Sequence, residues 1–127
     1  MKRKILYIVA FILITTTVLY ASFGWREVPY KEPDEEKGYK YVDWLWTYMG
    51  DDGGYEIGFD LDSTPSEVHI KIRDYFEYLI YNESWYGEAA GSDNIYLEEG
   101  WYWCQIVVFY DTYTGTDCGD WSINMWK

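Results

Sequence analysis

The sequence predicts an all-β domain, built as a two-layer antiparallel sandwich, behind one N-terminal hydrophobic helix. Alternation is the first reason, because apolar side chains occupy every second position of 55–61 and again of 68–72. Composition is the second reason. Aromatic residues make up 22% of the chain, and a single open sheet could not cover so many large side chains.

Each expected strand has its own signal. The segment 41–48 is rich in aromatic residues but less regular, whereas 55–61 and 68–73 alternate cleanly and are joined by a Ser-Thr-Pro turn. In 121–126 the apolar residues again share one face. With short apolar runs included, we expect seven strands, at 41–48, 55–61, 68–73, 76–81, 94–97, 101–110 and 121–126.

The alternation of apolar and polar residues along each strand also predicts which side chains are buried. The expected core face consists of Ile57, Phe59, Leu61, Val68, Ile70, Ile72, Ile106, Val108, Trp121 and Ile123. The side chains expected outside it are those of Glu56, Asp60, Lys71 and Arg73.

An uncharged stretch, 5–23, follows three basic residues at the N-terminus. As a helix it would rise about 28 Å, close to the roughly 30 Å of a bilayer's hydrocarbon core. Basic residues before such a stretch stay in the cytoplasm, so the rest of the chain is expected outside it, at the cell membrane or secreted. For 1–24 an uncleaved membrane anchor and a signal peptide cleaved near Ser22 and Gly24 both stay open, with a buried core helix as the third reading.

Two further parts follow this segment. Residues 25–38 are charged, contain Pro29 and Pro33, and show no apolar periodicity, so they are interpreted as an extended stalk. Residues 39–127 are interpreted as one β-sandwich domain.

All 22 acidic residues of the chain lie in 25–127, together with seven of the ten basic ones, which gives this portion a net charge of −15. Phosphate would be repelled, which argues against nucleic acid as a partner. An anionic membrane surface would be repelled as well. The simplest interpretation is that the charge keeps an aromatic-rich domain soluble.

Cys104 and Cys118 are the only cysteines. Outside the cytoplasm such a pair is expected to form a disulfide, closing a loop of about 15 residues worth roughly 3 kcal/mol in the chain-entropy model. Simple hairpin pairing of 101–110 with the last strand leaves Cys118 in the loop, so the loop would have to fold back over the sheet.

Little in the sequence indicates catalysis. His69 is the single histidine, and no Gly-x-Ser-x-Gly or HExxH motif accompanies it, which argues against hydrolase triads and zinc sites. We expect no enzyme and no cofactor. Four acids near one strand are either calcium ligands or solvated turn residues, and a two-carboxylate glycosidase is the least favoured reading; they are Asp51, Asp52, Asp60 and Asp62.

The aromatic residues carry the main functional signal. Along 101–110 one alternate set must face away from the core, and other rings fall in expected loops. Exposed rings bind sugars or dock protein partners, whereas the competing interpretation is packing in the core or in an oligomer. The candidates are Trp85, Tyr86, Trp101, Trp103, Phe109 and Tyr113. Asn82 begins an Asn-Glu-Ser sequon, expected in a surface loop.

Four motifs resemble the pre-peptidase C-terminal domain of exported bacterial and archaeal proteins, over about residues 54–127. They are EVHIKI after a Ser/Pro turn, YFEYLIYNES, LEEGWYWCQIVVF and the closing GDWSINMW. The chain departs from that family's pattern in having Tyr75 and Phe76 where the family usually has an Asp, and in its cysteine pair. The resemblance implies a jelly-roll-like β-sandwich with an accessory or binding role.

Two functions follow as hypotheses. The first is a non-catalytic, membrane-tethered extracytoplasmic module, anchored through 5–23, for recognition of another envelope protein or for structure at the cell envelope. The alternative is a secreted accessory domain that binds polysaccharide through exposed aromatic side chains. Cleavage of the N-terminal segment would separate them.

Overall fold

A computed structural model describes residues 23–34, 38–115 and 117–125. The predicted N-terminal helix lies outside these residues, and with it nearly all of the predicted anchor or signal segment. Within the described ranges, no helix has the length and apolar character needed to cross a membrane.

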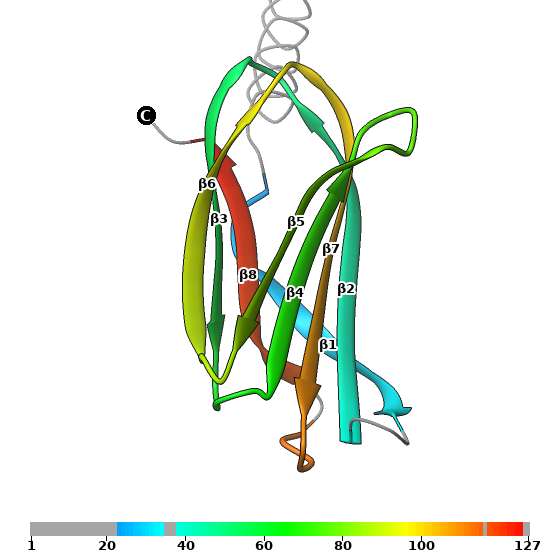
Figure 1. Cartoon of the computed structure of the whole chain (residues 1–127), viewed down its shortest axis with the longest axis vertical. Coiled ribbons are helices and arrows are strands. Elements are labelled where there is room, and N and C mark those ends of the chain that lie inside the picture. The colour runs from blue at the N-terminus through cyan, green and yellow to red at the C-terminus, as the bar shows by residue number, and fades with distance from the viewer. Residues whose placement is uncertain (1–22, 35–37, 116, 126–127) are drawn as a thin grey trace, which may run out of the picture.

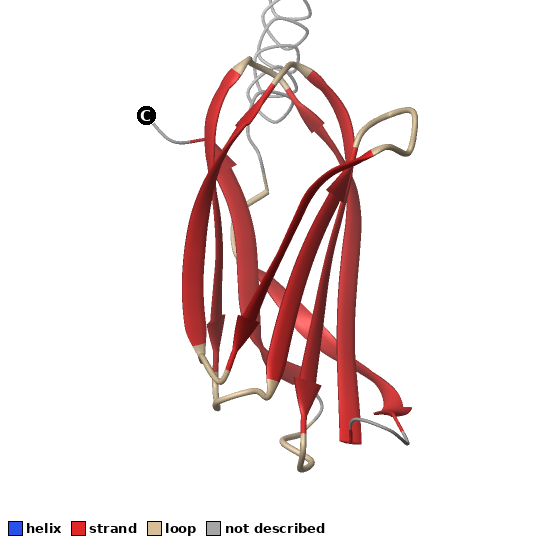
Figure 2. Ribbon diagram, in the orientation of Figure 1, coloured by secondary structure: helices blue, strands red, loops and turns tan. Residues whose placement is uncertain are grey.

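Every regular element in the described ranges is a strand (Figure 2). In chain order they are β1 (Arg26–Asp34), β2 (Gly38–Met49), β3 (Gly53–Leu61), β4 (Glu67–Arg73), β5 (Leu79–Tyr86), β6 (Ala90–Leu97), β7 (Gly100–Tyr110) and β8 (Asp117–Met125).

The strands form two antiparallel layers that face each other (Figure 1). The first sheet has the order β5-β4-β7-β2, and the second has the order β8-β3-β6. Strand β1 belongs to both, since it pairs with β8 near Arg26 and with β2 near Asp34. The predicted all-β sandwich is therefore confirmed, with eight strands instead of seven.

The additional strand corrects the stalk interpretation of 25–38. Val28 of β1 is fully buried between the layers, whereas Pro29, which cannot donate a backbone hydrogen bond, lies next to a break in the register. One buried apolar residue among charges and prolines leaves no alternating pattern. The strand is held by partners that are remote in sequence, and so its own sequence does not predict it.

Strand β5 also differs from the prediction, which began it at Phe76. The Asp74 carboxylate accepts hydrogen bonds from the backbone amides of Phe76 and Tyr78, at 2.9 and 3.0 Å, and so makes a turn of these residues. The strand starts at Leu79 and continues to Tyr86. Asn82 is therefore exposed on a strand at the edge of the first sheet, and not in a loop.

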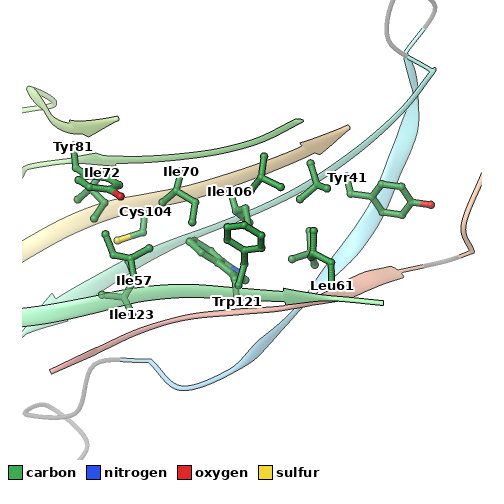
Figure 3. Close-up of a cluster of buried hydrophobic side chains, with 14 of the residues drawn as sticks. Tyr41, Ile57, Leu61, Ile70, Ile72, Tyr81, Cys104, Ile106, Trp121 and Ile123 are labelled. Carbon is green, nitrogen blue, oxygen red and sulfur yellow. The ribbon is translucent and has the colours of Figure 1, made fainter. Parts of the chain in front are cut away.

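The predicted core face is confirmed. All ten side chains are buried between the sheets, none more than 6% exposed, and Figure 3 shows several of them pointing into the same layer. Glu56, Asp60 and Arg73 are exposed, and Lys71 is half-buried. Several tyrosines outside the predicted set of ten complete the core and direct their hydroxyls to polar partners; these are Tyr41, Tyr55, Tyr81, Tyr102 and Tyr110.

The two sheets are linked across their edge strands. The Tyr81 hydroxyl of β5 donates a 2.9 Å hydrogen bond to the Asp93 carboxylate of β6. Trp85 of β5 packs edge-on against Phe59 of β3, with ring centroids 5.1 Å apart. These contacts close one side of the sandwich, and burial raises the pKa of Tyr81.

The predicted disulfide is wrong, because Cys104 and Cys118 are both free and buried. Cys104 lies on the inner face of β7, close to Ile57 of the opposite sheet (Figure 3). Ile57 pairs with Ile123 of β8, and Cys118 lies five residues earlier on that strand, about 16 Å away at a normal strand rise. The cysteines thus occupy different levels of the core.

The buried thiols should be unreactive in the folded protein. Burial raises the pKa of both Cys104 and Cys118 to about 12, so little thiolate exists at pH 8. We expect negligible labelling by a thiol reagent at pH 8 until urea unfolds the chain, and no effect of a reductant on the urea midpoint. A Ser92→Cys variant, exposed on β6, is the rapidly labelled control. Fast labelling of the folded wild type, or a midpoint lowered by reductant, would contradict this assignment.

Candidate functional site

The outer face of the first sheet carries a row of tryptophans. On β7 the side chains of Tyr102 and Cys104 point into the core. Successive side chains of a strand alternate in direction, so Trp101 and Trp103 point outward. On β2 the same parity turns Trp44 and Trp46 outward. Because Trp46 pairs with Trp103 across the two strands, all four indoles lie together on one surface.

These rings stack in a fixed order along the strands. Trp44 stacks on Trp103 with centroids 4.6 Å apart, and Trp46 stacks on Trp101 at 5.7 Å with nearly parallel planes. Trp46 and Trp103 instead meet at an angle of 52°, with centroids 6.1 Å apart. Tyr48 extends the row beyond Trp101. We call Trp44, Trp46, Tyr48, Trp101 and Trp103 the aromatic row.

A pocket of about 400 Å³ opens beside the tilted pair Trp46 and Trp103. Each of these rings is stacked on a tryptophan that does not line the pocket, and this stacking holds it in place. The remaining lining residues come from the end of β4 and the loop that follows it, and are Arg73, Asp74, Tyr75 and Glu77.

The loop between β4 and β5 is preorganised. It projects to the right of the first sheet in Figure 1, and Tyr75 lies 6.1 Å from Trp46, ring to ring. The Asp74 carboxylate holds two loop amides, and an Arg73 Nη1 donates to the Glu77 carbonyl at 3.1 Å. Glu77 has a φ of 68°, unusual for a non-glycine residue, which the hydrogen bonds on both sides maintain.

A polar cluster occupies the other end of the same face. The His69 ring nitrogens contact the Ser84 hydroxyl at 2.7 Å and the Glu67 carboxylate at 2.8 Å. The rings of Tyr86 and Phe109 meet the imidazole edge to face. The surface His69 predicted from the sequence is therefore half-buried and held in one orientation.

The structure brings together some of the predicted aromatic candidates and separates others. Trp101 and Trp103 belong to the aromatic row, and Tyr86 and Phe109 lie at the His69 end of the same face. Trp85 instead packs toward the core against Phe59. Tyr113, in the loop after β7, contacts Tyr39 of β2.

Sequence reasoning missed Trp44, Trp46 and Tyr75. The first two lie in the segment judged least regular, although their spacing of two residues matches that of Trp101 and Trp103 and could have indicated a shared face. Tyr75 was assigned to no face because the turn at Asp74 was not foreseen.

The proposed calcium ligands do not meet. Asp51 and Asp52 precede β3, whereas Asp60 and Asp62 lie at its far end, and a nine-residue strand spans about 30 Å. Asp52 accepts a hydrogen bond from the Glu99 amide at 2.6 Å. Among the described residues, no three His, Cys, Asp or Glu side chains are placed to hold a metal ion.

No protein-family model matches the chain, and a search of curated proteins found no match either. Among solved structures, a protein of Sulfurospirillum deleyianum is 11% identical, with a TM-score of 0.54 over 84% of this chain and 99% of that one. This likeness concerns the fold.

Carbohydrate-binding modules are also among the similar structures. One belongs to lichenase 5A of Cellvibrio mixtus and was solved with cellotriose; it is 14% identical, with a TM-score of 0.44 over 84% of this chain and 90% of that one. Another is the C-terminal module of a laminarinase of Zobellia galactanivorans, at 16% identity and a TM-score of 0.38, covering 80% and 99%. The resemblance to pre-peptidase C-terminal domains stays a prediction.

Proposed function

We propose that this chain is a non-catalytic module that binds a polysaccharide on the outer face of its first sheet. The observation that carries the proposal is the pocket, in which aromatic and hydrogen-bonding side chains converge. A sugar ring presents apolar C–H groups on its faces and hydroxyls around its rim. The faces of Trp46 and Trp103 suit the C–H groups, and the polar ends of Arg73 and Glu77 suit the hydroxyls.

The same pocket favours binding over hydrolysis. Glycoside hydrolysis usually needs two carboxyl groups on either side of the scissile bond. Asp74 and Glu77 are the two carboxylates of the pocket, but one oxygen of Asp74 is already bonded to two loop amides. One oxygen of Asp74 therefore positions the loop, and Glu77 is the carboxylate of the pocket that has no such role.

The location of the module rests on its N-terminal sequence. Three basic residues followed by the uncharged 5–23 stretch support export of the domain, whether the stretch is kept as an anchor or removed. Outside the cytoplasm, polysaccharides of the envelope or the surroundings would be within reach. A retained anchor would keep bound glycan at the membrane, which combines both functions expected from the sequence.

Removing a ring from the pocket should abolish most of the affinity. We expect Trp46→Ala and Trp103→Ala each to weaken binding at least tenfold, since one stacked aromatic contributes about 1.4 kcal/mol or more when it is buried by ligand. The full chain in detergent would be titrated with a panel of neutral and acidic polysaccharides. Binding would be measured by affinity electrophoresis and by tryptophan fluorescence.

The matched control is Tyr96→Ala, which removes a 65% exposed ring from β6 of the other sheet. Urea midpoints check that each variant is folded, and Trp46→Phe, which keeps a ring, should retain part of the affinity. Equal losses for Tyr96→Ala and Trp46→Ala would place binding elsewhere. A panel in which no polysaccharide binds would refute the function.

A further inference from the structure

The positive charges of the described domain are concentrated on the face that carries the aromatic row. The structure describes the side chains of four Lys and Arg residues. Arg26 is bonded to Asp43. The other three, Lys40, Lys71 and Arg73, all lie on the outer side of the first sheet, because their strand neighbours Tyr41, Ile70 and Ile72 point into the core.

Lys71 and Arg73 have no carboxylate partner among the residues whose side chains the structure describes, whereas Lys40 lies directly opposite Glu32 of β1. The ion pairs found there are Arg26 with Asp43 and His69 with Glu67. One N–H of Arg73 donates a hydrogen bond to the Glu77 carbonyl, and the guanidinium has four further N–H donors for a ligand. In a chain with 22 acidic residues, unpaired cations gathered on one face call for a ligand that supplies the negative charge.

The register places these charges beside the aromatic row. Arg73 of β4 pairs with Trp103 of β7, and Lys71 pairs with Gln105, whose other neighbour is Trp44. Neighbouring strands are about 4.8 Å apart, and residues two apart on one strand are about 7 Å apart. A sugar ring lying on an indole would thus have a cation at its side.

Carboxylates on this face lie near its two ends and are mostly engaged. Glu67 holds His69 at one end. At the other end Asp74 holds loop amides, Glu99 accepts a hydrogen bond from the Tyr48 hydroxyl, and Glu77 lines the pocket. The acids of the second sheet lie about 10 Å away, beyond the roughly 8 Å over which charges act at physiological ionic strength. The middle of the face is therefore locally positive.

We propose that the ligand of this face is an acidic polysaccharide, whose sugar rings lie on the aromatic row while their carboxylates bind Arg73 and Lys71. This inference rests on the proposed function and names its ligand class. A guanidinium binds a carboxylate through two parallel hydrogen bonds, which suits Arg73 to a uronic acid. Lys71 then binds the next carboxylate along the strand.

The test compares polysaccharides that differ only in charge. The full chain in detergent would be titrated with polygalacturonate, alginate and hyaluronate, and with the neutral esterified form of each. We expect at least one acidic form to bind ten times more tightly than its ester. Lys71→Gln, which changes a residue outside the pocket, should reduce this advantage severalfold and leave the affinity for the ester within twofold of wild type. Arg73→Gln also removes donors from the pocket, so it should weaken the binding of both forms, and that of the acid more.

Asn94→Asp is the control for net charge, because it adds one negative charge on the exposed side of β6 in the other sheet; it should change no affinity more than twofold. Equal binding of acids and esters would overturn the inference and leave the proposed function standing. The inference would also be overturned if cationic chitosan or single-stranded DNA bound more tightly than the three uronic-acid polysaccharides. The same holds if dextran sulfate bound and none of those three did. Absence of binding to every glycan would overturn both proposals.

Discussion

Replacing Asp43 with alanine is expected to cost the protein about 3 kcal/mol of its unfolding free energy, a large share of what a domain of this size holds. Asp43 is 8% exposed on the inner face of β2. It accepts hydrogen bonds from the Arg26 Nε at 3.0 Å, a second guanidinium nitrogen at 3.3 Å, and the Trp121 Nε1 at 2.7 Å. These bonds join β1, β2 and β8.

The alanine variant leaves three donor nitrogens, on two side chains, without an acceptor. Trp121 is fully buried, so its indole N–H would lose its partner in a place that water does not reach, and Arg26 would lose its counterion. Asp43→Asn keeps one carbonyl oxygen and should cost about half as much. Both effects would be measured from urea unfolding followed by tryptophan fluorescence.

Asp60→Ala serves as the matched control, because Asp60 is an exposed aspartate on β3 of the second sheet. A surface substitution of this kind should change the unfolding free energy by less than about 0.5 kcal/mol. If Asp43→Ala costs no more than Asp60→Ala, the network does not hold β1 between the two sheets.

Stability should fall steeply when the pH is raised from 9 to 11. Burial raises the pKa of Cys104 and Cys118 to about 12 in the folded state, whereas both thiols ionise near pH 9 once the chain unfolds. Below pH 9 neither state is ionised, and the folded state keeps its full stability. Above pH 9 the unfolded state loses protons that the folded state retains, which costs roughly 2–3 kcal/mol for each thiol by pH 11.

Buried tyrosines act in the same direction from about pH 10, since burial raises the pKa of Tyr55, Tyr81, Tyr102 and Tyr110. Urea unfolding between pH 8 and 11 measures the sum. The Cys104→Ala and Cys118→Ala double variant separates the thiols: it should be less stable at pH 8 but should lose less between pH 9 and 11. An equal loss in wild type and double variant would show that the thiols do not contribute.

The sequence by itself determined the class of fold and the register of its best strands. Alternation is a local property, and burying one face of β3 and β4 leaves no choice about which side chains point inward. Ile57, Ile70 and Ile72 are therefore buried as predicted, and Glu56 and Arg73 are exposed. The same patterns could not predict β1, whose place depends on strands at both ends of the chain.

Only the tertiary structure decided the site. Trp44 and Trp46 of β2 meet Trp101 and Trp103 of β7 because the two strands are neighbours in the first sheet, and strand order depends on how both layers pack. The cysteines show the reverse case. They are near in sequence, but β7 and β8 belong to opposite sheets, so Cys104 and Cys118 lie at different levels of the core. Local patterns determine which way a side chain points, whereas the packing of remote strands determines what it meets.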